Sequence, residues 1–322
     1  MYNLAIVIPC YNEQEALPHT YPQLEAVRAR LIRAGRATED SRIYFVDDGS
    51  SDQTWPIIQG LVACGKPVVG IKLSRNRGHQ NALLAGLMHA GGDAVVSVDA
   101  DLQDDLGVID TMMERFTTGV DIVYGVRAKR YTDSFFKRFT AQAFYRVLAW
   151  MGVTTVYNHA DYRLMSRRSI DALRKYPEAN LFLRGIIPLI GFTTCTVEYD
   201  RKARVAGESK YPLRKMLGLA VEAITSFSIV PLRLIAMLGL TVFLGTMVVT
   251  GWALWGYLFT DRTVPGWAST VLPIYFLGGL QLMSLGVMGE YLGKIYLETK
   301  RRPRFVIDRV VGMAIGDSDP RT

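Results

Sequence analysis

The chain has 322 residues, and its 37 lysines and arginines against 30 aspartates and glutamates give a net charge of +7. Hydrophobic residues make up 49% and the mean hydropathy is +0.14, which is high for a soluble protein and predicts membrane segments. The three cysteines are odd in number and lack metal-like spacing, which disfavours a disulfide framework or a cysteine metal site and fits a reducing compartment.

The first part of the chain alternates short apolar runs with helical patterns. Strands are expected at residues 4–9, 42–46, 68–73, 94–98 and 121–125. Helices are expected at about 14–34 and 55–63, from just after residue 81 to 89, and at 107–116. This alternation favours an α/β fold, with a parallel sheet flanked by helices.

Acidic residues follow the second and fourth expected strands. Asp47 and Asp48 either accept hydrogen bonds from a nucleobase and a ribose, or belong to a cluster that caps the next helix. Asp99 and Asp101, with Gln103 nearby, can hold a hard cation that also takes diphosphate oxygens. The alternative is a solvated loop whose aspartates cap a helix. Open α/β sheets bind ligands beyond the carboxyl ends of their strands, where these residues are expected.

The third expected strand leads into a basic turn that contains Arg75, Arg77 and Gly78. Phosphate binding at the following helix N-terminus and a merely solvated turn explain this stretch equally well. His79 receives no role, because no partner residue stands at a recognisable spacing.

The pattern is less regular after residue 130. Residues 134–151 are amphipathic and basic on one side, which suits either a core helix or one on a membrane surface. Asp161 is expected between an irregular turn and the start of a helix. A strand at 193–199 then leads into the basic loop 201–211, directly before the membrane segments.

Two uncharged segments, 234–259 and 264–289, each exceed the roughly 20 residues that cross a bilayer. Residues 213–231 are expected to form an interfacial amphipathic helix before the first of them. Basic residues flank the pair on both outer sides, which predicts that both termini are cytoplasmic. Because the excess charge lies beside the membrane, it favours anionic headgroups and phosphates and argues against nucleic-acid binding.

Six motifs, in this order, resemble those of family 2 glycosyltransferases with the GT-A fold, and in particular the polyprenyl-phosphate sugar synthases. That group includes dolichol-phosphate mannose synthases and bactoprenol glucosyl transferases. The motifs are IPCYNE (8–13), VDDGS (46–50), LSRN (73–76), DADLQD (99–104), ADYRL (160–164) and GESKY (207–211). The resemblance extends from Ile6 to about Val306, and GEYLG at 289–293 resembles the bacterial subgroup with two membrane spans.

The resemblance implies a role for each matching residue. The nucleotide-sugar site would be lined by Pro9, Tyr11, Glu13, Asp47, Asp48, Asn76 and Asp99. Asp101 and Gln103 would hold Mg²⁺ or Mn²⁺ at the diphosphate, and Asp161 would be the catalytic residue beside the acceptor. The acceptor phosphate would be bound by Arg127, Lys137, Arg204, Ser209 and Lys210. Asp105 departs from the family pattern, which often has proline there, so a different turn is expected.

The resemblance also implies a domain organisation. Residues 1–212 would form a cytoplasmic GT-A catalytic domain, 213–231 the interfacial helix, 232–290 a two-helix transmembrane anchor and 291–322 a cytoplasmic basic tail. The anchor would place the enzyme in the bacterial inner membrane. Gly289 and Gly293 have the spacing of a helix contact, and with the subgroup they predict a homo-oligomer.

The expected reaction is inverting transfer of a single hexose, glucose from UDP-glucose by subgroup resemblance, to undecaprenyl or another polyprenyl phosphate. The product would be a β-linked polyprenyl-phosphate sugar. The chain has no Gln-x-x-Arg-Trp signature of processive synthases, which favours one sugar per encounter. The alternatives are another sugar (mannose or an aminosugar), another lipid acceptor such as diacylglycerol, or a membrane scaffold that binds nucleotide sugar without turnover.

Overall fold

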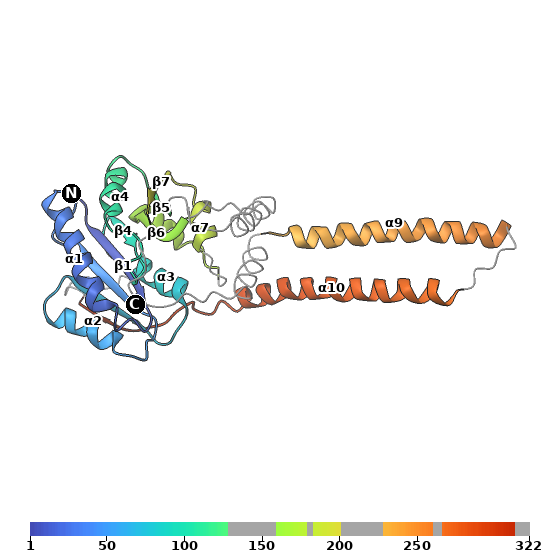
Figure 1. Cartoon of the computed structure of the whole chain (residues 1–322), viewed down its shortest axis with the longest axis horizontal. Coiled ribbons are helices and arrows are strands. Elements are labelled where there is room, and N and C mark those ends of the chain that lie inside the picture. The colour runs from blue at the N-terminus through green and yellow to red at the C-terminus, as the bar shows by residue number, and fades with distance from the viewer. Residues whose placement is uncertain (128–158, 179–182, 201–227, 260–265, 313–322) are drawn as a thin grey trace. The chain divides into compact units, whose positions relative to one another are not determined.

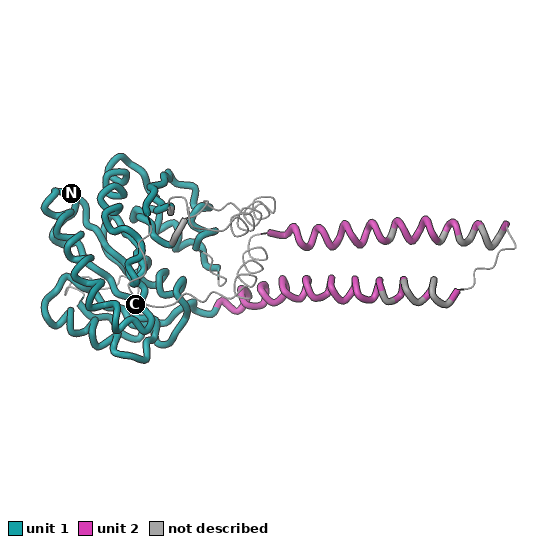
Figure 2. The backbone as a smooth tube through the Cα atoms, in the orientation of Figure 1, with its two compact units in different colours: residues 1–145, 154–211, 302–322 teal, residues 146–153, 212–301 magenta. Residues whose placement is uncertain are grey.

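The computed structural model describes residues 1–127, 159–178, 183–200, 228–259 and 266–312 (Figure 1). The chain divides into two compact units (Figure 2). Unit 1 comprises Met1–Tyr145, Thr154–Tyr211 and Arg302–Thr322, and unit 2 comprises Arg146–Val153 and Pro212–Arg301.

The described part of unit 1 contains an eight-stranded sheet in the order β7-β5-β6-β4-β1-β2-β3-β8. Its strands are β1 (Leu4–Cys10), β2 (Arg42–Asp47), β3 (Val68–Leu73), β4 (Ala94–Ser97), β5 (Ile122–Arg127), β6 (His159–Ser166), β7 (Thr194–Tyr199) and β8 (Ile307–Val311). The pairs β1–β2, β1–β4, β2–β3 and β5–β7 are parallel, whereas β6 runs antiparallel between β4 and β5. The predicted α/β fold with a mostly parallel sheet is confirmed.

Helices cover both faces of this sheet. They are α1 (Leu17–Arg33), α2 (Thr54–Ala63), α3 (His79–His89), α4 (Val108–Thr117), α6 (Arg167–Leu173) and α7 (Leu183–Leu189). Leu24 and Leu31 of α1 share a buried cluster with Ile6 of β1, while Gly86 of α3 lies against Val7, the next residue along β1. Because successive strand residues point to opposite faces, β1 is buried on both sides, which explains its unbroken apolar sequence.

Strand β8 returns the end of the chain to unit 1. It pairs antiparallel with β3, with Val310 opposite Ile71, and the Arg42 guanidinium donates to the Gly312 carbonyl at 2.7 Å. β8 therefore covers the edge of β3, which would otherwise present unpaired backbone groups. The sequence analysis assigned residues 291–322 to a basic tail and did not anticipate this strand.

The structure corrects the expectation for Asp161, which belongs to strand β6 and not to a turn before a helix. Tyr162 and Leu164 are buried, as are strand residues on a covered face, but Arg163 between them is also completely buried. Burial therefore does not alternate along this part of β6, because the charged side chains of Asp161 and Arg163 pair with each other inside the protein.

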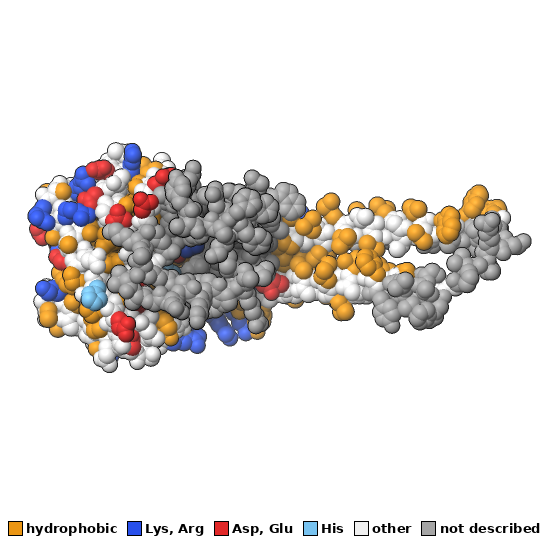
Figure 3. Space-filling model, in the orientation of Figure 1, with side chains coloured by type: hydrophobic (Ala, Val, Ile, Leu, Met, Phe, Trp, Pro, Cys, Tyr) orange, Lys and Arg blue, Asp and Glu red, His pale blue; other side chains and the backbone are white. Residues whose placement is uncertain are grey.

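Unit 2 contains the long helices α9 (Val230–Phe259) and α10 (Trp267–Thr299), which lie side by side (Figure 1). The Tyr291 hydroxyl donates to the Ser228 carbonyl at 2.5 Å and joins the end of α10 to the start of α9. Apolar side chains are exposed along both helices, as Figure 3 shows.

Within the described residues, one segment is long and apolar enough to cross a membrane: Val230–Val249, with a mean hydropathy of 2.1. Both long helices expected from the sequence are present, but two membrane spans are not confirmed. The expected helix at 134–151 and residues 213–227 of the expected interfacial helix lie outside the described residues.

Candidate active site

The carboxyl ends of β1, β2, β3 and β4 lie at one edge of the sheet, because these strands are mutually parallel. The loops that follow them are joined by backbone-to-side-chain hydrogen bonds. The amide of Glu13 donates to Thr54 Oγ1 at 2.8 Å, and that of Asn12 donates to Ser50 Oγ at 3.0 Å. This is the edge at which open α/β sheets bind ligands.

The two aspartates at the end of β2 differ in their hydrogen bonding. Asp48 accepts hydrogen bonds from the amides of Arg77 at 2.7 Å and Gly78 at 2.9 Å, so its carboxylate fixes the turn before α3. Asp47 is completely buried, and Oδ1 accepts from the Ser50 amide at 3.2 Å. Its buried Oδ2 has no hydrogen-bond partner among the described residues. Burial raises the pKa of both carboxyls. Asp47 thus retains an acceptor for a ligand donor.

Gly49 allows the loops after β2 and β3 to approach each other. Its φ of +69° favours glycine, and a Cβ there would lie 2.6 Å from the backbone of Arg75 and Asn76. The side chain of Asn76 is exposed and accepts from the Gly78 amide at 3.2 Å. At the end of β1, Pro9 is buried, whereas Tyr11 is 48% exposed and available to a ligand.

The loop after β4, residues 98–107, is attached to three separate elements. Thr20 of α1 donates to the Ala100 carbonyl at 2.8 Å, and Tyr162 of β6 donates to the Asp105 carbonyl at 3.0 Å. Tyr199 of β7 donates to the Asp104 carboxylate at 2.5 Å. Side chains from α1, β6 and β7 therefore hold this loop in place.

Negative charge accumulates around the same loop, in an acidic cluster formed by Glu13, Asp99 and Asp101. Burial, followed by repulsion from Asp101, Asp52 and Asp99, raises the pKa of Glu13. The pKa of the partly buried Asp99 is raised to about 6, mainly by burial and also by Asp161, Asp104 and Asp101. Mutual repulsion of this kind favours a bound cation.

The residues present fit a divalent metal that takes most of its ligands from a substrate. Among the described side chains, no three from His, Cys, Asp or Glu form a group that could hold a metal by themselves. Mg²⁺, however, is commonly bound through one or two carboxylates plus substrate phosphates and waters. Asp101 accepts from the Gln103 amide at 3.3 Å, and the buried Gln103 Nε2 lacks a partner in the described region. Turning the side-chain amide of Gln103 over would exchange Nε2 for Oε1, an oxygen that suits a hard cation.

Asp161 lies beside Asp99 because of strand register. Ser97 is opposite Arg163 in the antiparallel pair β4–β6, and continuing this register by two residues brings Asp161 opposite Asp99. The side chain of Asp161 is only 11% exposed and contacts two arginines. Arg163 Nη2 lies 2.5 Å from Oδ1, and Arg184 Nη2 lies 3.0 Å from Oδ2. Burial would raise the pKa of Asp161, but the two guanidinium groups outweigh burial and hold it well below its usual range.

Sequence reasoning missed two residues of this site. His79 Nε2 lies 3.5 Å from Asp99 Oδ1 and 3.8 Å from Asp161 Oδ2. Arg184 comes from α7, and its separation of 23 positions from Asp161 follows no recognisable spacing. Their only sequence signals were the position of His79 in the polar turn before an expected helix and the charge of Arg184 in an otherwise apolar segment.

The predicted acceptor-phosphate residues are only partly described. The backbone of Arg127 ends β5, where it is paired with Tyr199. The remaining four lie outside the described residues: Lys137, Arg204, Ser209 and Lys210. Their roles stay predictions.

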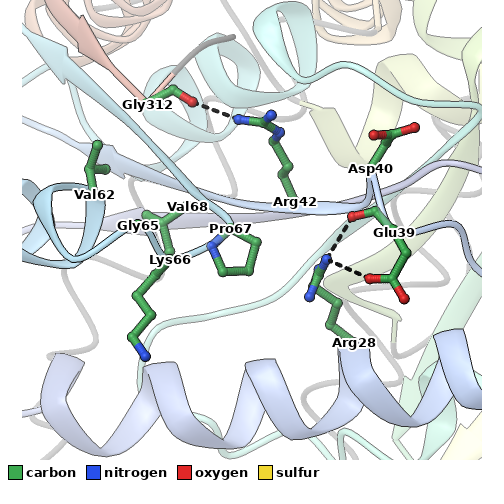
Figure 4. A pocket seen from close by; sticks show the side chains of 10 residues that line it. All are labelled: Arg28, Glu39, Asp40, Arg42, Val62, Gly65, Lys66, Pro67, Val68 and Gly312. Carbon is green, nitrogen blue, oxygen red and sulfur yellow. Dashed lines mark hydrogen bonds and ion pairs between the residues drawn. The ribbon is translucent and has the colours of Figure 1, made fainter.

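A separate hollow lies at the opposite edge of the sheet, near the amino ends of β2 and β3 (Figure 4). Arg28 donates to the Glu39 carbonyl at 2.7 Å, and Arg42 donates to Gly312. Both guanidinium groups therefore contact carbonyls of the protein itself, and Lys66 also lines the hollow.

Comparisons with known proteins identify a family for this chain. The model of the family described as "Glycosyl transferase family 2" matches residues 5–174. The chain is 52% identical to the uncharacterized glycosyltransferase YkoT of Bacillus subtilis, over 95% of this chain and 91% of the relative. It is 40% identical to the bactoprenol glucosyl transferase of Shigella phage SfV, over 94% of this chain and 97% of the relative.

Among solved structures, glucosyl-3-phosphoglycerate synthase from Mycobacterium tuberculosis, in complex with Mn²⁺, UDP and phosphoglyceric acid, matches with a TM-score of 0.44 and 17% identity. The match covers 69% of this chain and 76% of that one. The family match covers just over half of the chain and the relatives match nearly all of it, so the chain belongs to glycosyl transferase family 2.

Proposed function

We propose that this glycosyltransferase transfers one glucose from UDP-glucose to a polyprenyl phosphate, giving a β-linked product at the cytoplasmic face of the bacterial inner membrane. Relatives named bactoprenol glucosyl transferase are about 40% identical over most of the chain, which supports this substrate class. The observation that carries the proposal is the meeting of opposite charges at one sheet edge. The acidic cluster lies beside Asp161, which is bound by Arg163 and Arg184.

The nucleotide would bind at the ends of β1 and β2. Asp47 Oδ2, which has no hydrogen-bond partner in the described part of the chain, suits the single N–H donor of a uracil ring. Tyr11 offers an exposed aromatic face, and Pro9, Glu13, Asn76 and Asp99 complete the proposed lining. Asp48 takes part through the turn that it fixes before α3.

Asp101 and Gln103 would hold Mg²⁺ or Mn²⁺ beside the donor diphosphate. When bound, the cation neutralises the charge that develops on the leaving diphosphate. In the transfer, a phosphate oxygen of the acceptor attacks the anomeric carbon from the face opposite the diphosphate. The new carbon–oxygen bond forms as the bond to the diphosphate breaks and UDP leaves, so an α-linked donor gives a β-linked product.

Asp161 acts in this proposal by orienting the groups around the acceptor. A phosphate monoester has a second pKa near 6, so the acceptor is mostly dianionic at neutral pH and needs little help in losing a proton. Asp161 is also held in its charged form by two arginines, which makes it a weak proton acceptor. The proposed cations for the acceptor phosphate include Arg127, Lys137, Arg204 and Lys210, with Ser209.

Strand β8 supports the proposed membrane topology. Since β3 and β8 pair in one sheet, residues 68–73 and 307–311 lie on the same side of any membrane. The chain between them must cross an even number of times or not at all. An even number of crossings agrees with two spans, formed by the apolar helices α9 and α10. The basic residues that flank this pair of helices favour cytoplasmic termini. We also propose that the chain forms a homo-oligomer through the face of α10 that carries Gly289 and Gly293.

The proposal is tested with membranes that contain the full chain, undecaprenyl phosphate and labelled UDP-glucose. We expect label in a polyprenyl lipid, and little label when UDP-N-acetylglucosamine or GDP-mannose replaces the donor. Label in a diacylglycerol lipid would show that the acceptor is not a polyprenyl phosphate. Label from another donor would show that the sugar is not glucose. Binding of UDP without any transfer would identify a scaffold.

A further inference from the structure

Arg184 lies at the boundary between the protein interior and the active-site edge. Its side chain is 41% exposed, although the Asp161 carboxylate that it contacts is only 11% exposed. Nε lies 3.3 Å from Oδ1 and Nη2 lies 3.0 Å from Oδ2, so one edge of the guanidinium faces both carboxylate oxygens. A two-point contact of this kind fixes the plane of the guanidinium group.

The local structure holds Arg184 in this position. The amide of Leu183 donates to the side-chain oxygen of Gln80 in α3 at 3.0 Å. Leu183, Ile186 and Ile187 are completely buried, and their helical spacing places one face of α7 in the core. Arg184 is therefore held by a backbone anchor, a buried apolar face and a carboxylate.

Two guanidinium groups meet at Asp161. Those of Arg163 and Arg184 share its single carboxylate. Arg163 is completely buried, whereas the side chain of Arg184 is 41% exposed. Arg184 is thus the more accessible guanidinium group of the two.

The position of this charge suits an anionic substrate group. Asp161 and Asp99, which both lie near His79, would by themselves repel a phosphate. The guanidinium groups of Arg163 and Arg184 oppose this repulsion at Asp161. A planar guanidinium matches the oxygen geometry of a phosphate.

We propose that Arg184, oriented by the positioning residue Asp161, binds a phosphate group of a substrate in the active site. The identity of that phosphate rests on the proposed function: it is either the monophosphate of the polyprenyl acceptor or the diphosphate of the nucleotide sugar.

The experiment measures binding and turnover separately, with the full chain in detergent. Binding of UDP and binding of undecaprenyl phosphate are each measured by titration without the other substrate. The variants are Arg184→Gln, Arg184→Lys and Asp161→Asn. The matched control is Arg168→Gln, which removes another exposed arginine that pairs with a carboxylate, that of Asp121, in the same unit. Near-UV circular dichroism establishes that each variant is folded.

We expect Arg184→Gln to weaken one of the two bindings about 10-fold or more, because a charge-assisted two-point contact is lost. Arg184→Lys should restore part of that affinity, and Arg168→Gln should retain all of it. Weaker binding of undecaprenyl phosphate alone assigns the acceptor monophosphate, whereas weaker binding of UDP alone assigns the donor diphosphate. Asp161→Asn should weaken the same binding, and the double variant should lose less than the two single losses combined.

A folded Arg184→Gln that binds UDP and undecaprenyl phosphate as the wild type does would overturn the inference. An Asp161→Asn variant that leaves the Arg184-dependent affinity unchanged would overturn the positioning role. Arg184-dependent binding in a wild-type protein that transfers no glucose would instead reject the proposed function and leave this inference standing.

Discussion

The hydroxyl of Tyr199 donates a hydrogen bond to the Asp104 carboxylate at 2.5 Å, across 95 positions of the chain. Both residues are buried, and the ring of Tyr162 meets that of Tyr199 edge-on at 5.4 Å between centroids. The acidic loop after β4 is therefore positioned by β6 and β7, which lie on the far side of the sheet order from β1 to β3.

Replacing Tyr199 with phenylalanine tests this attachment. The variant removes one donor to a buried carboxylate, so we expect the free energy of unfolding to fall by about 1–3 kcal/mol. A higher Mg²⁺ concentration should also be needed for half-maximal turnover, because Asp101 lies in the loop that is loosened. Tyr176→Phe is the control, since within the described ranges its hydroxyl donates only to the Leu189 carbonyl, at 3.4 Å and in an exposed position. Wild-type melting and metal dependence in Tyr199→Phe would contradict the attachment.

Removal of the metal is the second prediction. EDTA should abolish glucosyl transfer, and Mg²⁺ or Mn²⁺ should restore it, because the cation stabilises the leaving diphosphate. Asp101→Ala should lose activity and still insert into membranes. Asp105→Asn serves as its control, since an amide oxygen can still accept from the Gly107 amide as the carboxylate does at 3.1 Å. Full turnover by Asp101→Ala would remove the metal assignment.

Asp121 provides a prediction for stability against pH. Burial opposes its ionisation, but hydrogen bonds from Arg168, Thr193 and Ser166 outweigh burial and lower its pKa. A lowered folded pKa stabilises the protein above the unfolded value, near 3.9, and this contribution is lost as the pH falls through the folded value.

Asp121→Asn should therefore lower the melting temperature at neutral pH by roughly 2 to 4 °C. The difference from the wild type should shrink below about pH 4. The control Asp171→Asn removes a carboxylate that is 57% exposed and 3.5 Å from Arg174, and it should change little. A difference that grows on acidification would reverse the assigned sign.

The sequence predicted the parts of the fold that depend on local patterns. Strand-length apolar runs that end in aspartate placed Asp47 and Asp101 at the correct edge of the sheet, because parallel strands share that edge. Position alone did not predict how each carboxylate is used. Asp48 has both oxygens occupied by backbone amides, whereas its neighbour Asp47 does not.

Contacts between distant segments were not predictable in the same way. His79 and Arg184 meet Asp161 only because α3, β6 and α7 converge in space. Strand β8 was missed because it is short, its residues are mixed in polarity and it follows a basic segment that is typical of a solvated tail. Its β-branched residues Ile307, Val310 and Val311 suit a strand, but only the structure shows that this strand pairs with the edge of β3.

Membrane topology is the fourth prediction. Because β8 pairs with β3, reporters fused before Met1 and after Thr322 should give the same signal, and the basic flanks predict that the side is cytoplasmic. A phosphatase that is active only outside the cytoplasm should remain inactive in both fusions. Opposite signals from the two fusions would be incompatible with the β3–β8 pair and with two spans.

The last prediction separates an orienting Asp161 from a general base. Its pKa is held well below the usual range by Arg163 and Arg184 against the effect of burial, so the carboxylate is charged throughout the pH range of enzyme assays. Asp161→Asn removes this charge and the fixed plane of Arg184, and kcat should fall at least tenfold, within the range that such positioned groups contribute. The ratio of variant to wild-type kcat should then stay constant from about pH 6.5 to 9, since the acceptor is already ionised above its second pKa near 6. A general base would behave differently, because its loss would matter less as the acceptor ionises by itself. A ratio that rises towards one with increasing pH would indicate that Asp161 is a general base. A kcat of Asp161→Asn equal to that of the wild type at neutral pH would show that Asp161 has no role in the reaction.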